Sequence, residues 1–363
     1  MTRAVLASVA FALLAWGGLV RAGPPVSLPA FNVDIRETSV SGLSSGAYMA
    51  VQLQVAHSSI IKGAGIIAGG PYWCAQGSAY TATTRCSCTL DPAHRMCNVS
   101  AESTDVAALV AATRRFAREG LIDDIANLAR QRTFVVAGGR DETVPPAVAG
   151  QLRGYLLDMG AAAENVSFAT LAGAGHGLPT VDYGGACDVS ATPYINDCDY
   201  DAAGRLLEWI YGPLNPARRG APQGRFVRFD QRPFTPTHFG FAWFTGLDDS
   251  GWFYVPDACA RGEPCRLHVA LHGCRQGQSY SSSIWPGGAR YGTAFVEHAG
   301  YDAWADTNRL VVLFPQAVSV MFANPNGCWD WWGYTDRHYA DRHGVQMRAI
   351  RAMIDRIASG AVD

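Results

Sequence analysis

Close to its start the chain carries one motif that narrows the choice of fold, Gly42-Leu-Ser-Ser-Gly46. It matches Gly-x-Ser-x-Gly, a sharp turn from a strand into a helix that exposes a serine. The turn is so tight that small residues are needed two positions before and after the nucleophile, and only Ser44 has glycines at both. Ser44 is therefore the candidate nucleophile, and the backbone N–H of Ser45 can serve an oxyanion.

The same five-residue pattern also occurs in ordinary Gly/Ser turns, so its surroundings decide between the two interpretations. An apolar, β-branched approach over residues 31–40 precedes the motif, and residues 47–56 follow with apolar side chains at helical spacing. Strand, turn and helix are the context that a nucleophile elbow requires. The sequence thus favours the elbow over an ordinary turn.

Two later segments end in polar residues that complete a catalytic triad. An apolar strand over residues 133–138 leads to Asp141, and another over 165–171 leads to His176. Taken singly, Asp141 is a common turn residue and His176 an ordinary surface histidine. Jointly, they follow Ser44 in the chain order of α/β-hydrolases, at the strand ends where open α/β sheets bind ligands. We predict Ser44 as nucleophile, His176 as base and Asp141 as the carboxylate that orients it.

The second half of the chain supplies a strand that such a hydrolase normally has before its nucleophile. Residues 265–271 read as a strand and lead into His272-Gly273, which is typical of an oxyanion loop. Too little chain precedes Ser44 for that strand, so we infer a circular permutation, which surface termini allow. The Pro-rich residues 213–236 are interpreted as a surface connection and not as a domain linker. The predicted fold is a single-domain, circularly permuted α/β-hydrolase over residues 23–363, with a mostly parallel central sheet flanked by helices.

Residues 1–22 read as a secretory signal peptide. Arg3 is followed by a short apolar run and by the small-residue site Val20-Arg-Ala22. A membrane anchor is the alternative, but the apolar run is short for a bilayer and no later segment is long enough to span one. We expect cleavage near Ala22 and a secreted protein, extracellular or periplasmic.

The ten cysteines fit an exported, disulfide-bonded chain. Zinc is the alternative, but the clusters lack the paired two-residue spacing of zinc sites, so no metal is expected. Short spacings favour bridges Cys187–Cys198 and Cys259–Cys265, with two more among a local cluster and one long-range pair left over. That cluster is Cys74, Cys86, Cys88 and Cys97, and the remaining pair is Cys274 and Cys328. The formal charge of −2 gives no basic footprint, so nucleic acid is not expected as a partner.

Three segments together resemble one family. Residues 41–49 around the elbow, Leu271-His-Gly-Cys-Arg-Gln276 and Asn326-Gly-Cys-Trp-Asp-Trp-Trp-Gly-Tyr334 are similar to the secreted poly(3-hydroxybutyrate) depolymerases with a permuted catalytic domain. The resemblance covers nearly the whole mature chain and implies the same triad, with the N–H groups of Ser45 and Cys274 as the oxyanion hole. It also implies a cleft tryptophan near Trp331 or Trp332. No cofactor is implied.

Members of that family with several domains carry a linker and a separate polymer-binding module, and we expect neither here. Binding would then use the catalytic domain itself, where aromatic side chains offer a flat apolar surface to a polyester. These residues are Trp329, Trp331, Trp332 and Tyr334, and the alternative is that they belong to the core. The expected partner is a polyester surface or oligomer, and the expected state a monomer.

The predicted activity is hydrolysis of poly(3-hydroxybutyrate) to 3-hydroxybutyrate monomers and oligomers. One alternative is a secreted carboxylesterase that acts on feruloyl or acetyl groups of plant polysaccharide, although a sugar-facing cleft would not need the Trp-rich segment. The other is a non-catalytic polymer-binding protein, against which an intact Ser44, Asp141 and His176 argue.

Overall fold

One large sheet forms the centre of the computed structural model, which describes residues 23–89, 97–235, 245–283 and 288–360. Within these residues the sheet has eight strands in the order β4-β3-β2-β1-β10-β11-β9-β8. The strands are β1 (Val33–Leu43), β2 (Ile61–Ile67), β3 (Arg132–Gly138), β4 (Val166–Leu171), β8 (Arg225–Asp230), β9 (Ser250–Val255), β10 (Cys265–Leu271) and β11 (Leu310–Phe314). The expected signal peptide over residues 1–22 lies outside the described residues.

The strand order confirms the permutation. β1 lies at the centre and pairs in parallel with β2 on one side and with β10 on the other, so that Val40 opposes both Ala64 and Val269. β10 thus borders the strand of the elbow although it follows about 230 residues later. Among the strands that the structure describes, the antiparallel pairs are those of β9 with β8 and with β11, so the sheet is mostly parallel as predicted.

Burial explains why the central strands read as continuous apolar runs. Every residue of β11 is buried, and β2 and β10 each have only one residue that is not. Parallel strands covered on both faces have this composition. The edge strand β4 instead alternates between half-buried and exposed residues after its first position.

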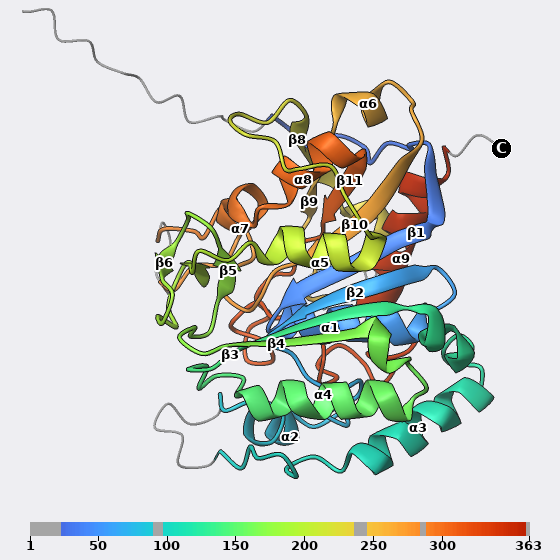
Figure 1. Ribbon diagram of the computed structural model, residues 1–363, viewed down its shortest axis with the longest axis vertical. Helices are drawn as coiled ribbons and strands as arrows, with labels where there is room; N and C mark the ends of the chain where they lie inside the picture. The colour runs from blue at the N-terminus through green and yellow to red at the C-terminus, as the bar shows by residue number, and fades with distance from the viewer. Residues whose placement is uncertain (1–22, 90–96, 236–244, 284–287, 361–363) are drawn as a thin grey trace, which may run out of the picture.

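Helices cover both faces of the sheet, as Figure 1 shows for α4 and α5 on opposite sides of β2, β3 and β4. One apolar layer is formed with α1 (Ser45–Ala56), α3 (Val106–Arg118), α4 (Pro146–Asp158) and α9 (Val345–Ala358). The other is formed with α5 (Ala202–Tyr211), α7 (Ala294–His298) and α8 (Tyr301–Asn308). Short helices α2 (Ala79–Thr84) and α6 (Asp257–Ala260) lie at the periphery. No helix among the described residues is long and apolar enough to cross a membrane.

Most expected elements agree with the structure to within about three residues, and the differences have local causes. The sequence also predicts a helix over residues 122–130, whereas the structure has a 3-10 helix over Ile125–Arg130, which begins after the Asp124 cap. Helix α5 was not predicted, although Asp201 caps it by accepting the Gly204 N–H at 2.7 Å. A small sheet of β5 (Leu178–Thr180), β6 (Gly185–Ala186) and β7 (Ile195–Asp197) was also missed, because two- and three-residue strands carry no periodicity. The sequence further predicts a β-rich segment over residues 239–254, the first residues of which lie outside the described part.

All ten cysteines are paired in the structure. The bridges are Cys74–Cys86, Cys88–Cys97, Cys187–Cys198, Cys259–Cys265 and Cys274–Cys328. Four close short loops, and the fifth joins segments 54 residues apart.

Candidate active site

The turn between β1 and α1 has the geometry of a nucleophile elbow. Ser44 lies at the start of α1 with φ 58° and ψ −121°, a conformation that is strained for a residue other than glycine. A Cβ on Gly42 would lie 2.2 Å from the carbonyl carbon of Gly46, and a Cβ on Gly46 would lie 2.3 Å from the Leu271 carbonyl oxygen. Both glycines are therefore required, the first by the turn itself and the second by the loop that follows β10.

Asp141 and His176 form a buried, hydrogen-bonded pair. Asp141 follows β3 and His176 follows β4, which are parallel neighbours, and His176 Nδ1 lies 2.7 Å from Asp141 Oδ2. The other carboxylate oxygen accepts the backbone N–H groups of Thr143 and Val144, each at 2.8 Å. Because the carboxylate can only accept, His176 donates from Nδ1 and its Nε2 remains an acceptor.

Ser44 lies at the same edge of the sheet, because β1 to β4 are parallel and each candidate follows the carboxyl end of its strand. Its side chain is nearly buried, and the structure records no hydrogen bond of its hydroxyl among the described residues. Catalytic hydrogen bonds are often long without substrate. The structure therefore brings Asp141 and His176 into contact and places Ser44 at the same strand ends.

The loop after β10 lies directly against the elbow. A Cβ on Gly273 would lie 3.4 Å from Ser44 Cβ, and the Gly273 N–H is already taken by Gln276 Oε1 at 2.6 Å. For the N–H groups of Ser45 and Cys274, no acceptor is recorded in the part of the chain that the structure describes. These two amides are free to face an oxyanion.

His272 does not compete with His176 for the role of base. Its Nε2 accepts the Ala317 N–H at 3.1 Å, and its Nδ1 donates to the Gly273 carbonyl at 2.7 Å. Complete burial lowers the pKa of His272 to about 4, so the ring stays neutral. It therefore acts as a structural support of the loop before Cys274.

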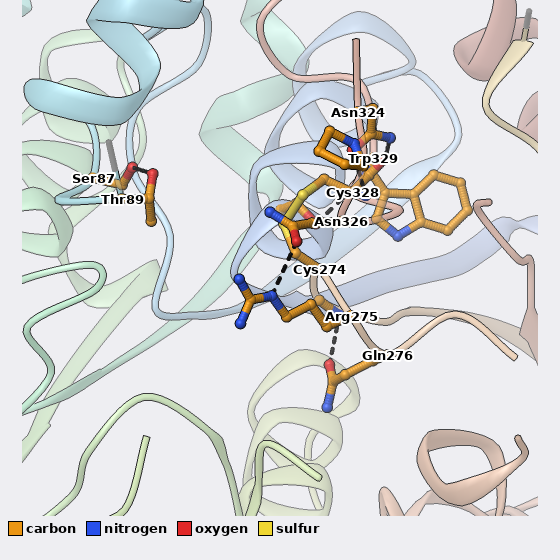
Figure 2. Close-up of a disulfide and its surroundings, with 12 residues drawn as sticks. Ser87, Thr89, Cys274, Arg275, Gln276, Asn324, Asn326, Cys328 and Trp329 are labelled. Atoms are coloured by element: carbon orange, nitrogen blue, oxygen red, sulfur yellow. Dashed lines mark hydrogen bonds between the residues drawn. A yellow bond between two sulfur atoms is a disulfide. The ribbon is translucent and has the colours of Figure 1, made fainter. Parts of the chain in front are cut away.

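The Cys274–Cys328 disulfide fastens this loop to the Trp-rich segment (Figure 2). The neighbouring Arg275 donates its backbone N–H to the Asn326 carbonyl at 2.7 Å and its Nε–H to the Asn326 side chain at 3.1 Å. Trp329 donates its indole N–H to the His272 carbonyl at 2.9 Å. One disulfide and three hydrogen bonds thus hold the backbone that carries the candidate oxyanion donor.

The four predicted substrate-binding aromatic residues divide between core and surface. Trp329 is fully buried, so this residue belongs to the core and offers no binding surface. Trp331 is also largely buried and stacks on Tyr48 at 4.0 Å, whereas Trp332 and Tyr334 are half-buried and lie 5.0 Å apart. The rings of Trp332 and Tyr334 thus remain as partly exposed members of the aromatic group.

Three supporting residues had no recognisable role in the sequence. Ser190 Oγ accepts the His176 backbone N–H at 2.8 Å, and the Tyr194 ring lies 6.2 Å from the imidazole. Gln276 Nε2 donates to the carbonyl of Tyr194 at 3.2 Å and so joins the loop after β10 to the histidine loop. Ser190 and Tyr194 lie in an irregular stretch, where only the bounding cysteines gave a sequence signal.

A cluster of two serines and a histidine lies inside the sheet and is not a nucleophile site. His268 on β10 is fully buried, with Nδ1 2.6 Å from Ser39 Oγ and Nε2 2.7 Å from Ser41 Oγ. Burial lowers the pKa of His268 to about 3. The same two serines also bond the hydroxyls of Tyr211 and Tyr301. This network cross-links β1 to β10 and to the helices above them.

An exposed apolar turn lies on the segment that leads to the Trp-rich loop. Met321 is 76% exposed and Phe322 is 94% exposed, between Val320 and Asn324, which pair with each other. The Asn324 side chain also accepts the Cys328 N–H at 2.9 Å. The turn is thus joined to the Cys274–Cys328 disulfide of the loop after β10.

Comparison with known proteins finds two curated relatives and several solved structures, while no family model matches the chain. The chain is 41% identical over 99% of its length to a "Poly(3-hydroxybutyrate) depolymerase" of Delftia acidovorans, of which it spans 66%. It is 39% identical to a "Polyhydroxybutyrate depolymerase" of Talaromyces funiculosus and covers 93% of that protein.

Two solved structures superpose with a TM-score of 0.80, 37% identity and coverage of 93% of this chain and 100% of theirs. One is a PHB depolymerase from Penicillium funiculosum, and the other is a PHB depolymerase variant complexed with an R3HB trimer.

Proposed function

The chain belongs to the poly(3-hydroxybutyrate) depolymerase family, and from that premise we propose that it hydrolyses the ester bonds of poly(3-hydroxybutyrate) through Ser44. The observation that carries this proposal is the buried Asp141–His176 pair at the sheet edge where the Ser44 elbow also ends. The products are 3-hydroxybutyrate and its short oligomers.

The reaction follows from the donors and acceptors of the site. Ser44 Oγ attacks the ester carbonyl while His176 Nε2 takes the hydroxyl proton, and Asp141 stabilises the imidazolium through Nδ1–H. The Ser45 and Cys274 amides hold the oxyanion. When the intermediate collapses, His176 returns the proton to the departing alcohol and leaves a 3-hydroxyacyl ester on Ser44. Water, activated by the same base, then releases the acid and restores the serine, with no cofactor.

A polyester chain has few hydrogen-bond donors, so apolar surface next to the site supports this substrate. We propose that Trp332 and Tyr334 line the binding surface. The more deeply buried Trp331 packs against Trp332, with the two ring centroids 5.7 Å apart. Met321 and Phe322 lie on the same disulfide-linked segment and extend this surface. Binding to the polymer would then use the catalytic domain itself.

Two further parts of the proposal concern the protein's setting. The five disulfides support export to an oxidising compartment, either extracellular or periplasmic. One chain supplies every group of the proposed site, which is consistent with action as a monomer.

The deciding experiment compares two serine variants. Ser44→Ala should abolish turnover of poly(3-hydroxybutyrate) film and of a soluble p-nitrophenyl ester. Ser39→Ala, which alters a buried serine bonded to His268, should retain turnover of the soluble ester. Near-normal turnover by Ser44→Ala would show that the nucleophile is assigned wrongly.

A substrate comparison separates the proposal from its alternatives. We expect clearing of poly(3-hydroxybutyrate) suspensions and no comparable release of ferulate or acetate from plant polysaccharide; the reverse would favour the feruloyl or acetylxylan-type esterase. A fluorophosphonate probe should label the wild type and not Ser44→Ala. No labelling of either would favour a non-catalytic polymer-binding protein.

A further inference from the structure

A cluster of metal-binding side chains lies outside the active site, between the Trp-rich segment and α9. His338, Asp341 and His343 bring one possible ligand atom each to within 4.8 Å of one another. His338 Nδ1 lies 2.7 Å from Asp341 Oδ2, and His343 Nδ1 lies 3.1 Å from Asp341 Oδ1. The two imidazoles therefore already converge on one carboxylate.

The backbone under this cluster is fixed from the inside. Tyr72 donates its hydroxyl to the Ala340 carbonyl at 2.7 Å, and Gln52 Nε2 donates to the Tyr339 carbonyl at 3.1 Å. Tyr339 and Ala340 are buried, whereas the His343 side chain is 57% exposed. The segment thus keeps its core side anchored and turns its two imidazoles toward solvent over the buried Asp341 carboxylate, which is the preorganisation that a metal site needs.

The Asp341 carboxylate has no permanently charged partner among the described residues that would replace a metal ion. The side chain of Asp341 is 9% exposed, and its ion-pair partners among the described residues are the two imidazoles, which are charged only when protonated. The adjacent Arg342 is paired with Asp123 at 3.0 Å instead. A buried carboxylate is normally paired with a cation or coordinates a metal.

We propose that His338, Asp341 and His343 bind one divalent transition-metal ion of the Zn²⁺ class. Bond lengths of about 2.0–2.2 Å in a tetrahedral site separate neighbouring ligand atoms by about 3.3–3.6 Å. The His343–Asp341 distance of 3.1 Å is near that spacing, whereas the His338–Asp341 distance of 2.7 Å must widen when the ion enters. Two imidazoles and one carboxylate suit Zn²⁺ better than Ca²⁺ or Mg²⁺, which prefer oxygen ligands. Solvent supplies the remaining ligand at this exposed position.

Metal binding changes the hydrogen bonds in a defined way. Each imidazole coordinates through Nδ1, and its proton moves through solvent to Nε2, so a neutral ring stays neutral. At His338 this Nε2 now accepts from Arg337 Nε at 3.2 Å. Arg337 is exposed and must turn away when the metal binds, so it competes with the ion.

The bound ion cross-links two positions of the segment that leads to α9. It joins His338, which follows the Trp-rich segment, to His343, which lies directly before the Gly344 cap of α9. It therefore stabilises the connection that positions the aromatic residues. This inference does not rest on the proposed ester hydrolysis.

Calorimetric titration of the chelator-treated full-length protein with ZnCl₂ tests the proposal. We expect saturation at one ion per chain, a rise in Tm with Zn²⁺, and no comparable effect of CaCl₂. His343→Gln and Asp341→Asn should each weaken Zn²⁺ binding by at least about 10-fold. Arg337→Ala should tighten it.

The controls separate this site from other histidines. His298→Gln changes a histidine that stacks on Tyr183 and should bind Zn²⁺ as the wild type does. Retention of the wild-type affinity in His343→Gln and Asp341→Asn would overturn the proposal. So would binding that is lost only in a His176→Asn variant, because the ion would then sit in the active site.

Discussion

Removing the Cys274–Cys328 disulfide tests whether the oxyanion loop must be held rigidly. Serine at both positions breaks a cross-link between residues 54 apart, which the chain-entropy model values at about 4 kcal/mol. The contacts from Arg275 to Asn326 and from Trp329 to His272 remain, so the two segments stay adjacent. We expect a folded protein with a lower free energy of unfolding.

The same change should also slow the reaction. Loss of one oxyanion donor costs about 10²–10³ in kcat. In the double variant the backbone N–H of residue 274 is still present, but its position is less fixed. We therefore expect kcat to fall by about 10- to 100-fold, with a smaller change in KM. The measurement is steady-state turnover of a soluble p-nitrophenyl ester, with circular dichroism to verify folding and guanidinium titration to measure stability.

A matched control distinguishes a local effect from general destabilisation. The Cys259–Cys265 bridge closes a separation of 6 residues at the start of β10, the end away from the site, and its loss should cost about 2 kcal/mol. Serine at both of its positions should leave kcat unchanged. An unaltered kcat in the Cys274/Cys328 variant, or an equal fall in both variants, would refute the rigidity argument.

Three further predictions concern the elbow, the buried histidines and the exposed turn. Gly46→Ala should lower Tm and abolish turnover, because the new Cβ would lie 2.3 Å from the Leu271 carbonyl oxygen. Gly150→Ala in α4, where a Cβ meets open space, should instead raise the free energy of unfolding by about 0.5–1 kcal/mol. Thermal unfolding of both variants measures the two effects, and equal changes in Tm would contradict the prediction. Burial lowers the pKa of His268 to about 3 and that of His272 to about 4. The stability that each neutral ring contributes is therefore complete above the unfolded pKa of about 6.5 and falls by about 1.4 kcal/mol per pH unit below it. Guanidinium titrations at pH 7.5 and 5.5 should show this loss of stability, and His268→Gln should make the loss smaller. Phe322→Ser should weaken adsorption to polymer film and leave soluble-ester kinetics unchanged, since the ring is 94% exposed; equal adsorption of both proteins would exclude the turn from the binding surface.

The elements that position the predicted site could be predicted because their signals are local. Gly42 and Gly46 fix the elbow by excluding side chains, and the apolar run of β10 predicts a buried strand before His272. Each of these signals can be recognised within its own segment, without knowing which other segments it contacts. The permutation followed from where the two motifs lie in the chain.

The supporting contacts could not be predicted, because they join irregular segments. Nothing in the residues around Ser190 or Tyr194 indicates that their loop folds back onto His176. The buried Trp329 likewise donates a hydrogen bond to the His272 carbonyl, 57 positions away in the chain. Sequence composition cannot distinguish such a core tryptophan from a surface one.

The position of β1 has a consequence for how the protein is made. This strand leaves the ribosome first, yet one of its two neighbours is β10, whose residues follow about 230 positions later. At about 5–20 residues per second, one side of the central strand would wait about 12–46 s for its partner. During that interval an apolar strand edge stays unpaired, which favours aggregation. The proposed nucleophile Ser44 also exists for that time without the Cys274 amide, so on the proposed mechanism an incomplete chain lacks one oxyanion donor until synthesis is nearly finished.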